Sequence, residues 1–158
     1  MKHNFLFLIL SICVVAFFGC NNNGSRPEGM PRLVPCVVTV LSEGQPLSEV
    51  DVAFHSSDST FRWGSNATTD SNGKAVMATY GQFFGVVEGE YSVTVTKLER
   101  ETFDNEHPPK QIKVFTLTDV QYTNPQTTPL KITVSGKTTQ TFDVGKTGKN
   151  VLRLESPM

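Results

Sequence analysis

The sequence predicts an all-β domain, and two observations support this prediction. Between residues 33 and 154, short runs of alternating apolar and polar residues are separated by clusters of Gly, Pro, Asn and Asp. No stretch repeats apolar residues with the period of an amphipathic helix, whereas Val, Thr and Phe, which favour strands, recur throughout. We expect about seven strands, which a chain of this length accommodates in one domain.

The first two strands follow from alternation and from one turn. A strand is expected at residues 33–41, where Val and Leu recur, and a turn at residues 42–47 follows it. In the next strand, Val50, Val52 and Phe54 alternate with polar or small residues. Because neighbouring side chains of a strand point to opposite faces, these three residues are expected to face a core.

The sharpest turn of the sequence contains Asn72 and Gly73. Both residues tolerate the positive φ of a tight turn, so residues 68–74 are expected to close a hairpin with a strand at residues 75–80. A second turn is expected at residues 86–90, because Gly89 stands there between charged residues.

The clearest strand follows this second turn, and a long irregular insert comes after it. Tyr91, Val93 and Val95 share one face of that strand. The insert covers residues 99–129, with an edge strand expected at residues 112–117; it is either a packed surface excursion or a functional loop. The remaining strands are expected around Leu130, Ile132 and Val134, at residues 141–144 and at residues 151–154.

Residues 1–19 are expected to form a signal peptide. A short positive head precedes an apolar run that ends at Phe18, and this run has signal length rather than membrane-spanning length. The following Gly19 and Cys20 resemble the end of the bacterial lipobox, although Phe17 and Phe18 are bulkier than is usual in that motif. In the lipobox, a small residue precedes a cysteine that receives a diacylglycerol thioether and then a fatty acid such as palmitate on its amine.

The lipobox resemblance implies cleavage between Gly19 and Cys20 and attachment of the mature chain to a membrane through Cys20. Residues 20–32 then form the lipidated cysteine and a flexible tether, and residues 33–158 form the folded domain. Asn21 stands where an aspartate retains enterobacterial lipoproteins at the inner membrane, so a cell-envelope location at the outer membrane is preferred. A plain secretory signal and an uncleaved anchor remain as alternatives.

Three segments of the domain have a spacing that belongs to a known family. They are Gly44, Pro46 and Leu47 before Val50; Thr69, Asp70 and Gly73; and Gly89, Tyr91, Val93 and Val95. Together they resemble the carboxypeptidase regulatory-like domain over roughly residues 34–97, with Val50 in place of the usual alanine. The resemblance implies a Greek-key β-sandwich of transthyretin-like (prealbumin-like) or immunoglobulin-like type. It also implies a binding or structural accessory module without catalytic residues.

The residues offer little chemistry for catalysis. The formal net charge is −1 at pH 7 without a basic stripe, so nucleic acid is not an expected partner. No nucleophile elbow and no phosphate-binding glycine loop occur, and we expect no enzyme activity and no cofactor. The alternative is a small metal-dependent envelope enzyme or metal-binding protein that uses His55, His107 and carboxylates of the insert.

Four aromatic residues form the candidate binding surface for an envelope protein or a polysaccharide. Phe61 and Trp63 lie in a predicted loop, and Phe83 and Phe84 in the next turn, where exposed rings stack on sugars or anchor protein contacts. In the alternative, Trp63 folds back and caps the open end of the domain. Cys36, the remaining cysteine of the mature chain, is expected to be buried without a disulfide.

Overall fold

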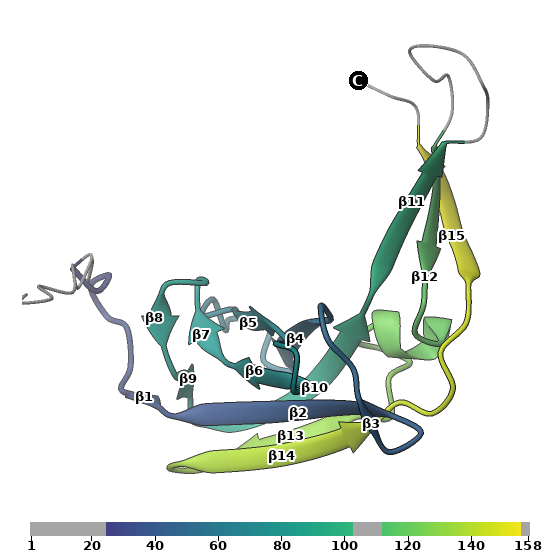
Figure 1. Ribbon diagram of the computed structural model, residues 1–158. Helices are drawn as coiled ribbons and strands as arrows, with labels where there is room; N and C mark the ends of the chain where they lie inside the picture. The colour runs from purple at the N-terminus through teal and green to yellow at the C-terminus, as the bar shows by residue number, and fades with distance from the viewer. Residues whose placement is uncertain (1–24, 103–111, 156–158) are drawn as a thin grey trace, which may run out of the picture.

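The computed structural model describes residues 25–102 and 112–155, and these residues form an all-β structure with one short 3-10 helix, η1 (Val120–Thr123). Two sheets face each other as a β-sandwich, and a narrow third sheet projects from one end of it (Figure 1). The six-stranded sheet has the order β13 (Lys131–Val134), β10 (Gly89–Thr96), β4 (Asp51–Ser56), β5 (Ser65–Thr68), β7 (Ala78–Thr79) and β8 (Phe83–Phe84).

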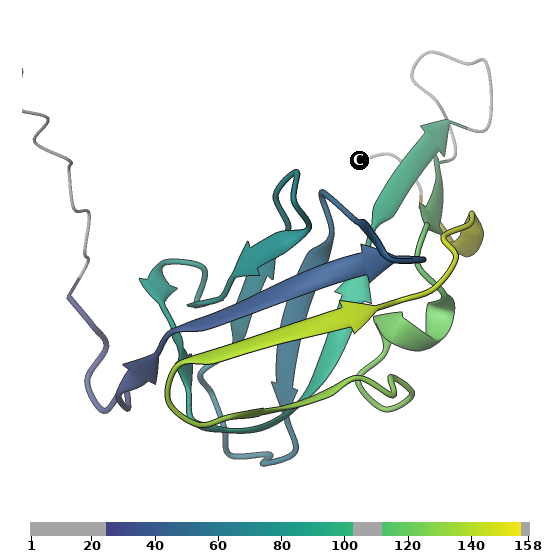
Figure 2. The same cartoon turned by 60° about the horizontal axis from the view of Figure 1, so that its bottom comes forward.

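The second layer of the sandwich is built on the longest strand of the first half of the chain. Its members are β14 (Thr138–Asp143), β2 (Cys36–Ser42), β3 (Gln45–Pro46) and β6 (Lys74–Val76). β14 runs parallel to β2, whereas β3 and β6 pair with β2 in the antiparallel sense. Figure 2 shows β2 and β14 lying side by side across the front of the sandwich, with β4 and β10 behind them.

Two smaller sheets complete the structure. β1 (Leu33–Val34) pairs with β9 (Val86–Val87) where the described chain enters the sandwich. The projecting sheet, which we call the arm, consists of β11 (Leu98–Thr102), β12 (Ile112–Thr116) and β15 (Asn150–Glu155), with β12 in the centre. The described residues therefore contain fifteen short strand segments, more than the seven predicted, because several expected strands are divided between sheets.

The core lies between the two layers of the sandwich, and it is filled by the apolar side chains that the alternating pattern predicted to face inward. The faces predicted from Val52 and Phe54 and from Val93 and Val95 are confirmed, since all four side chains are buried. Tyr91 joins them, and its hydroxyl donates a 2.6 Å hydrogen bond to the Val87 carbonyl, which satisfies its polar end. Other members of this cluster include Cys36, Val38, Val40, Val50, Ala75, Met77, Ile132, Val134 and Phe142.

The predicted strand at residues 33–41 is present but divided. Pro35 stands between β1 and β2, and proline has no N–H to donate to a ladder. The turn predicted at residues 86–90 is wrong in its first half, because Val86 and Val87 form β9 against β1. The side chains of Val86 and Val87 are buried. Their packing beside β1 therefore favours a strand over a turn at these two residues.

The turn at residues 68–74 is confirmed, but the hairpin predicted around it is wrong. Asp70 closes the turn: its carboxylate accepts the amides of Asn72 and Lys74 at 2.8 and 3.0 Å. However, β5 before the turn belongs to the six-stranded sheet and β6 after it pairs with β2. The chain therefore crosses from one layer to the other, and the buried Met77 separates β6 from β7 where a single strand was expected.

The edge strand predicted at residues 112–117 is a strand, but not an edge. β12 pairs with β11 on one side and with β15 on the other. The second partner comes from near the C-terminus, so its contact with β12 is a long-range pairing that no local pattern contains. Val114 at the centre of β12 is completely buried.

Asp143, the last residue of β14, joins the end of β14 to the turn between β2 and β3 by hydrogen bonds. Its carboxylate accepts hydrogen bonds from the backbone N–H groups of Glu43 (3.1 Å), Gly44 (2.8 Å) and Gly145 (2.8 Å). Glu43 and Gly44 form the turn between β2 and β3, and both have positive φ. The hydrogen bonds from Gly145 and then Gly44 hold the pKa of Asp143 below its ordinary value.

We expect Asp143→Asn to destabilise the protein at neutral pH and to lose this effect in acid. Because the pKa of Asp143 is lower in the folded than in the unfolded state, the stabilisation is present above the unfolded value of 3.8 and is lost as the pH falls through the folded value. Urea denaturation of wild type and variant at a series of pH values measures the difference. Two stability curves that stay parallel across the acidic range would contradict this assignment.

Candidate functional site

The structure turns most of the predicted aromatic surface inward. Trp63 is only 8% exposed and packs with Leu33, Phe83 and Val87 in a second hydrophobic cluster. Phe61 is half-buried, and its ring meets the Tyr91 ring edge-on at a centroid distance of 5.7 Å. The four predicted residues therefore do not form one exposed surface, and the alternative in which Trp63 folds back is the one observed.

The loop before Trp63 explains this arrangement. The Asp58 carboxylate accepts the backbone N–H of Thr60 at 2.8 Å and its hydroxyl at 2.7 Å. The Phe61 N–H donates to the Asp58 carbonyl at 3.0 Å, which tightens the turn. Phe61 and Trp63 then face inward, while Arg62 between them is exposed with its guanidinium 5.1 Å from the centre of the Trp63 ring.

Phe83 and Phe84 point to opposite faces because they occupy successive positions of one strand. Phe83 is 8% exposed in the cluster with Trp63, whereas Phe84 is 78% exposed. Phe84 lines a shallow groove with Val76, which is also exposed. The other lining residues are Asn66, Ala67, Thr68, Asp70, Lys74, Ala78 and Gly81.

Sequence reasoning missed Tyr80 as a surface residue; it precedes Gly81, which lines this groove. Tyr80 has a φ of 54° and is 46% exposed, and its hydroxyl donates a 2.7 Å hydrogen bond to the Arg62 carbonyl. Its ring lies 5.8 Å from that of the buried Trp63. The only local signal was the following Gly81, which marks the turn between β7 and β8.

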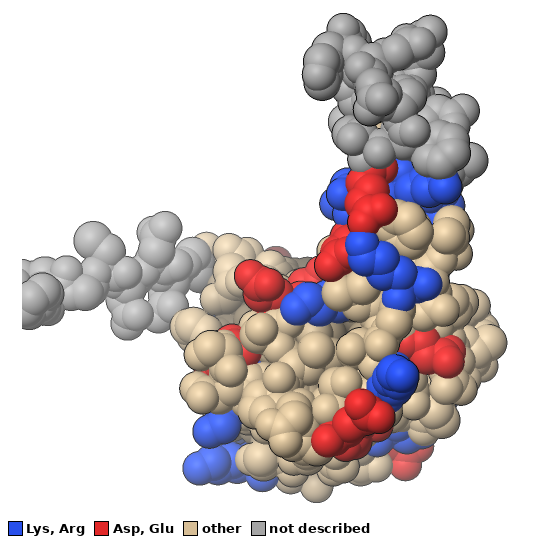
Figure 3. Space-filling model, turned by 45° about the vertical axis from the view of Figure 1, so that its right-hand side comes forward, with Lys and Arg blue, Asp and Glu red and all other residues tan. Residues whose placement is uncertain are grey.

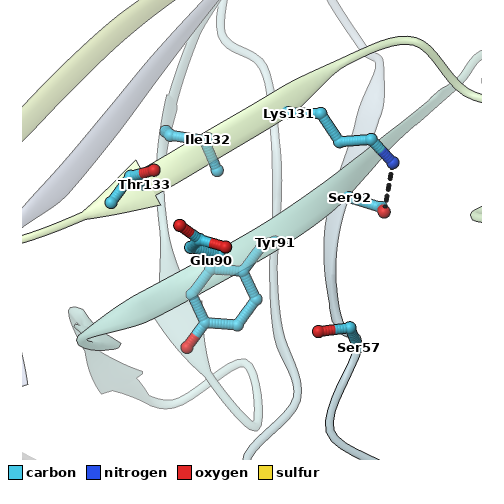
Figure 4. Close-up of a pocket in the computed structure, with 7 residues that line it drawn as sticks. All are labelled: Ser57, Glu90, Tyr91, Ser92, Lys131, Ile132 and Thr133. Atoms are coloured by element: carbon cyan, nitrogen blue, oxygen red, sulfur yellow. Dashed lines mark hydrogen bonds between the residues drawn. The ribbon is translucent and has the colours of Figure 1, made fainter.

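A second hollow lies on the polar outer face of the six-stranded sheet. It is lined by Ser57, Glu90, Tyr91, Ser92, Lys131, Ile132 and Thr133 (Figure 4). The register places Ser92 opposite Lys131, and the Lys131 ammonium donates a 2.7 Å hydrogen bond to the Ser92 hydroxyl. The hollow offers one ammonium, one carboxylate and hydroxyl groups, which suit hydrogen bonding to a polar ligand.

His55 does not belong to a metal site in the described part of the chain. Its Nε2 atom lies 2.9 Å from the Thr94 hydroxyl oxygen, and burial lowers its pKa. Within residues 25–102 and 112–155, no group of three His, Cys, Asp or Glu side chains is arranged to hold a metal ion. His107, the partner in the metal-dependent alternative, lies outside the described residues.

Two described acidic residues of the insert, Glu99 and Glu101, are engaged in ion pairs on the arm. The Lys149 ammonium lies 3.0 Å from the Glu99 carboxylate and also pairs with Glu101. These hydrogen bonds, first with Glu101 and then with Glu99, raise the pKa of Lys149. Lys149 also lies 5.5 Å from the centre of the Phe115 ring. Figure 3 shows acidic and basic side chains gathered along the arm.

Cys36 is buried, as the sequence predicts, and its thiol is free. Burial raises the pKa of Cys36 to about 11, so the thiolate that reacts with oxidants or metals is scarce at neutral pH. This residue therefore contributes to packing in the core.

Gly19 and Cys20, the residues of the predicted cleavage and lipidation site, lie outside the described residues. Among the residues that are described, no helix has the length and apolar character needed to cross a membrane. No protein-family model, no curated protein and no solved structure matches this chain.

Proposed function

We propose that this protein is a lipid-anchored module of the bacterial cell envelope that presents a binding surface to a protein partner and catalyses no reaction. The position of the arm carries this proposal. The described chain begins at the end of the sandwich where β1 and β8 lie, and the arm projects from the opposite end (Figure 1). Cys20 precedes the first described residue, Ser25, by only five positions, so a lipid on Cys20 would attach the chain at the end of the sandwich opposite the arm.

The arm is attached to the sandwich in a way that fixes its direction. β11 continues the chain of β10 after a single intervening residue, Lys97. The Leu117 N–H donates to the Lys97 carbonyl at 2.8 Å, and the Thr118 hydroxyl donates to the Val95 carbonyl at 2.9 Å. Because these hydrogen bonds, the second of them buried, join the base of the arm to the core strand β10, the arm is held to the sandwich by its own backbone rather than by a free linker.

The surface of the arm suits a protein better than a sugar polymer. One face combines the ion pairs of Lys149 with the partly exposed ring of Phe115, and Val151 opposite Phe115 is 59% exposed. Apolar groups bordered by charged residues are the common composition of protein interfaces. The two outer strands β11 and β15 also offer a partner the edges of a three-stranded sheet.

We also propose that the sandwich is of the carboxypeptidase regulatory-like type. In support, the segments that carry the resemblance fall in distinct structural places: residues 44–47 around the turn between β2 and β3, residues 69–75 in the crossing between the layers, and residues 89–95 in β10. Each segment thus coincides with a turn or with a core strand, where its glycines and alternating apolar residues have a structural purpose.

The anchor is tested with the full-length protein produced in a bacterial host that lipidates its own lipoproteins. Cys20→Ser is expected to release the protein from the membrane fraction and to abolish metabolic labelling by a palmitate analogue. Cys13→Ser, which alters a cysteine inside the predicted signal, is the matched control and is expected to change neither. Labelled, membrane-bound Cys20→Ser protein would overturn the anchor.

The binding surface is tested by chemical cross-linking in intact cells, followed by mass spectrometry of the captured partner. Val151 on the arm and Val76 on the sandwich are 59% and 56% exposed, so Val151→Glu and Val76→Glu place the same charge on two surfaces of equal accessibility. We expect Val151→Glu to lose the cross-linked partner and Val76→Glu to retain it. Loss only in Val76→Glu would move the binding surface to the groove, and no change in either variant would overturn the arm as a binding element.

A further inference from the structure

A small patch at the entry of the chain combines aromatic and basic side chains. It consists of Arg62, Tyr80 and Phe84, which we call the entry patch. Phe84 on β8 and Tyr80, directly after the paired strand β7, are exposed large hydrophobic residues, and Arg62 is exposed beside Tyr80, whose hydroxyl donates to the Arg62 carbonyl. Tyr80 and Arg62 cover the buried Trp63 ring from outside, and Phe84 makes no part of either hydrophobic cluster.

The entry patch lies where the N-terminal segment joins the domain. β1 pairs with β9, which begins two residues after Phe84, and a Cβ atom at the intervening Gly85 would lie only 2.8 Å from the Val34 carbonyl oxygen. The Arg62 Nη2 atom lies 3.8 Å from the position that a Cβ atom would take at Gly29. Arg62 and the residue after Phe84 therefore both lie next to the N-terminal segment, residues 25–34.

The length of the connecting chain keeps this end of the domain near whatever holds Cys20. Twelve residues separate Cys20 from Leu33, which span at most about 45 Å when fully extended. A turn shortens the segment further, because the Met30 N–H donates to the Pro27 carbonyl at 3.1 Å. A lipid on Cys20 thus attaches the bilayer to the end of the domain that carries the entry patch, which lies opposite the arm.

The chemistry of the patch matches a bilayer surface. Phe and Tyr rings partition to the boundary between headgroups and acyl chains, where the ring is apolar and a hydroxyl can remain hydrated. Arg26 and Arg32 on the tether are exposed and add to the charge of Arg62, against Glu28 on the tether and Asp58 in the loop that carries Arg62. This excess of positive charge attracts anionic phospholipid headgroups.

We propose that the entry patch lies against an anionic bilayer and orients the domain with the arm away from the membrane. This inference rests on the lipid anchor of the proposed function and adds the lipid surface as a second contact of the folded domain. It also assigns a role to Phe84, the predicted aromatic residue that remains largely exposed.

Trp63 provides a built-in probe for this contact, because it is the only tryptophan of the chain and lies directly beneath Tyr80 and Arg62. The full-length lipidated protein is reconstituted in vesicles of phosphatidylethanolamine and phosphatidylglycerol that carry a lipid with a spin label near the headgroup. We expect strong quenching of Trp63 in the wild type. Phe84→Glu is expected to lower the quenched fraction about twofold, and Val120→Glu, at an exposed residue of η1, to leave it unchanged.

Failure of the lipid anchor and failure of the patch contact give different experimental results. If the protein does not sediment with the vesicles, the anchor itself fails. If it sediments but Trp63 is not quenched, or if Phe84→Glu is quenched as strongly as the wild type, the anchor stands and the contact of the patch is overturned. Quenching that does not fall when phosphatidylglycerol is replaced by phosphatidylcholine overturns the contribution of the arginines.

Discussion

Trp63→Ala is expected to destabilise the protein by about 3–5 kcal/mol, the usual cost of truncating a buried tryptophan. The ring fills the cluster that joins the chain entry at Leu33 to β8 and β9, where Phe83 and Val87 are its neighbours. Removing it leaves a cavity that these neighbours, held by strand pairing, refill only in part. Equilibrium urea denaturation followed by circular dichroism measures this loss.

Phe84→Ala is the matched control for this prediction. Phe84 is 78% exposed, so its truncation is expected to change the free energy of unfolding by less than about 0.5 kcal/mol. Equal losses in Trp63→Ala and Phe84→Ala would contradict the burial described here. The comparison also matters for function, because loss of binding in Trp63→Ala reports a weakened fold, whereas loss in a Phe84 variant reports a surface contact.

Gly73→Ala is expected to be comparably damaging, for a reason that lies in the backbone. Gly73 has a φ of 71°, and a Cβ atom there would lie 2.5 Å from the Val40 carbonyl oxygen. The Gly73 carbonyl accepts the Val40 N–H at 2.8 Å, so the turn cannot move away without losing its bond to β2. The left-handed conformation costs about 1–2 kcal/mol and the overpacking a further 1–3 kcal/mol, roughly.

Gly44→Ala separates these two contributions. Gly44 has a φ of 79°, but nothing lies within 4 Å of the position that its Cβ atom would take. We expect this variant to show only the conformational cost of about 1–2 kcal/mol, measured by the same denaturation experiment. A Gly73→Ala variant no less stable than Gly44→Ala would contradict the expected clash between a Cβ atom at residue 73 and the Val40 carbonyl oxygen of β2.

Both large predictions concern the ends of the sandwich where the layers are joined. Trp63 fills the end at which the N-terminal segment enters, and Gly73 lies in the turn that carries the chain from β5 to β6. The first region also supports the further inference, since Tyr80 and Arg62 of the entry patch lie over Trp63. Variants designed to test binding should therefore avoid both residues.

The sequence by itself determined the all-β class and the core faces of the longest strands. At Val52 and Phe54, and at Val93 and Val95, alternation alone identified the buried side chains, because a strand that covers a core must place every second residue on it. The turn at Asn72 and Gly73 was equally local, since it depends on the positive φ of Gly73 and on the Asp70 carboxylate. The candidate lipid anchor likewise rests on a contiguous motif.

The tertiary structure decided everything that depends on which strands meet. Nothing near residues 68–80 indicates that β5 and β6 belong to different layers, because each layer is completed by strands distant in the chain. The same holds for β12, whose second partner is β15. Phe83 and Phe84 are identical in sequence terms, and only the position of β8 beside the Trp63 cluster buries the one and exposes the other. Burial at a sheet edge is set by long-range packing, which a local pattern of residue types does not contain.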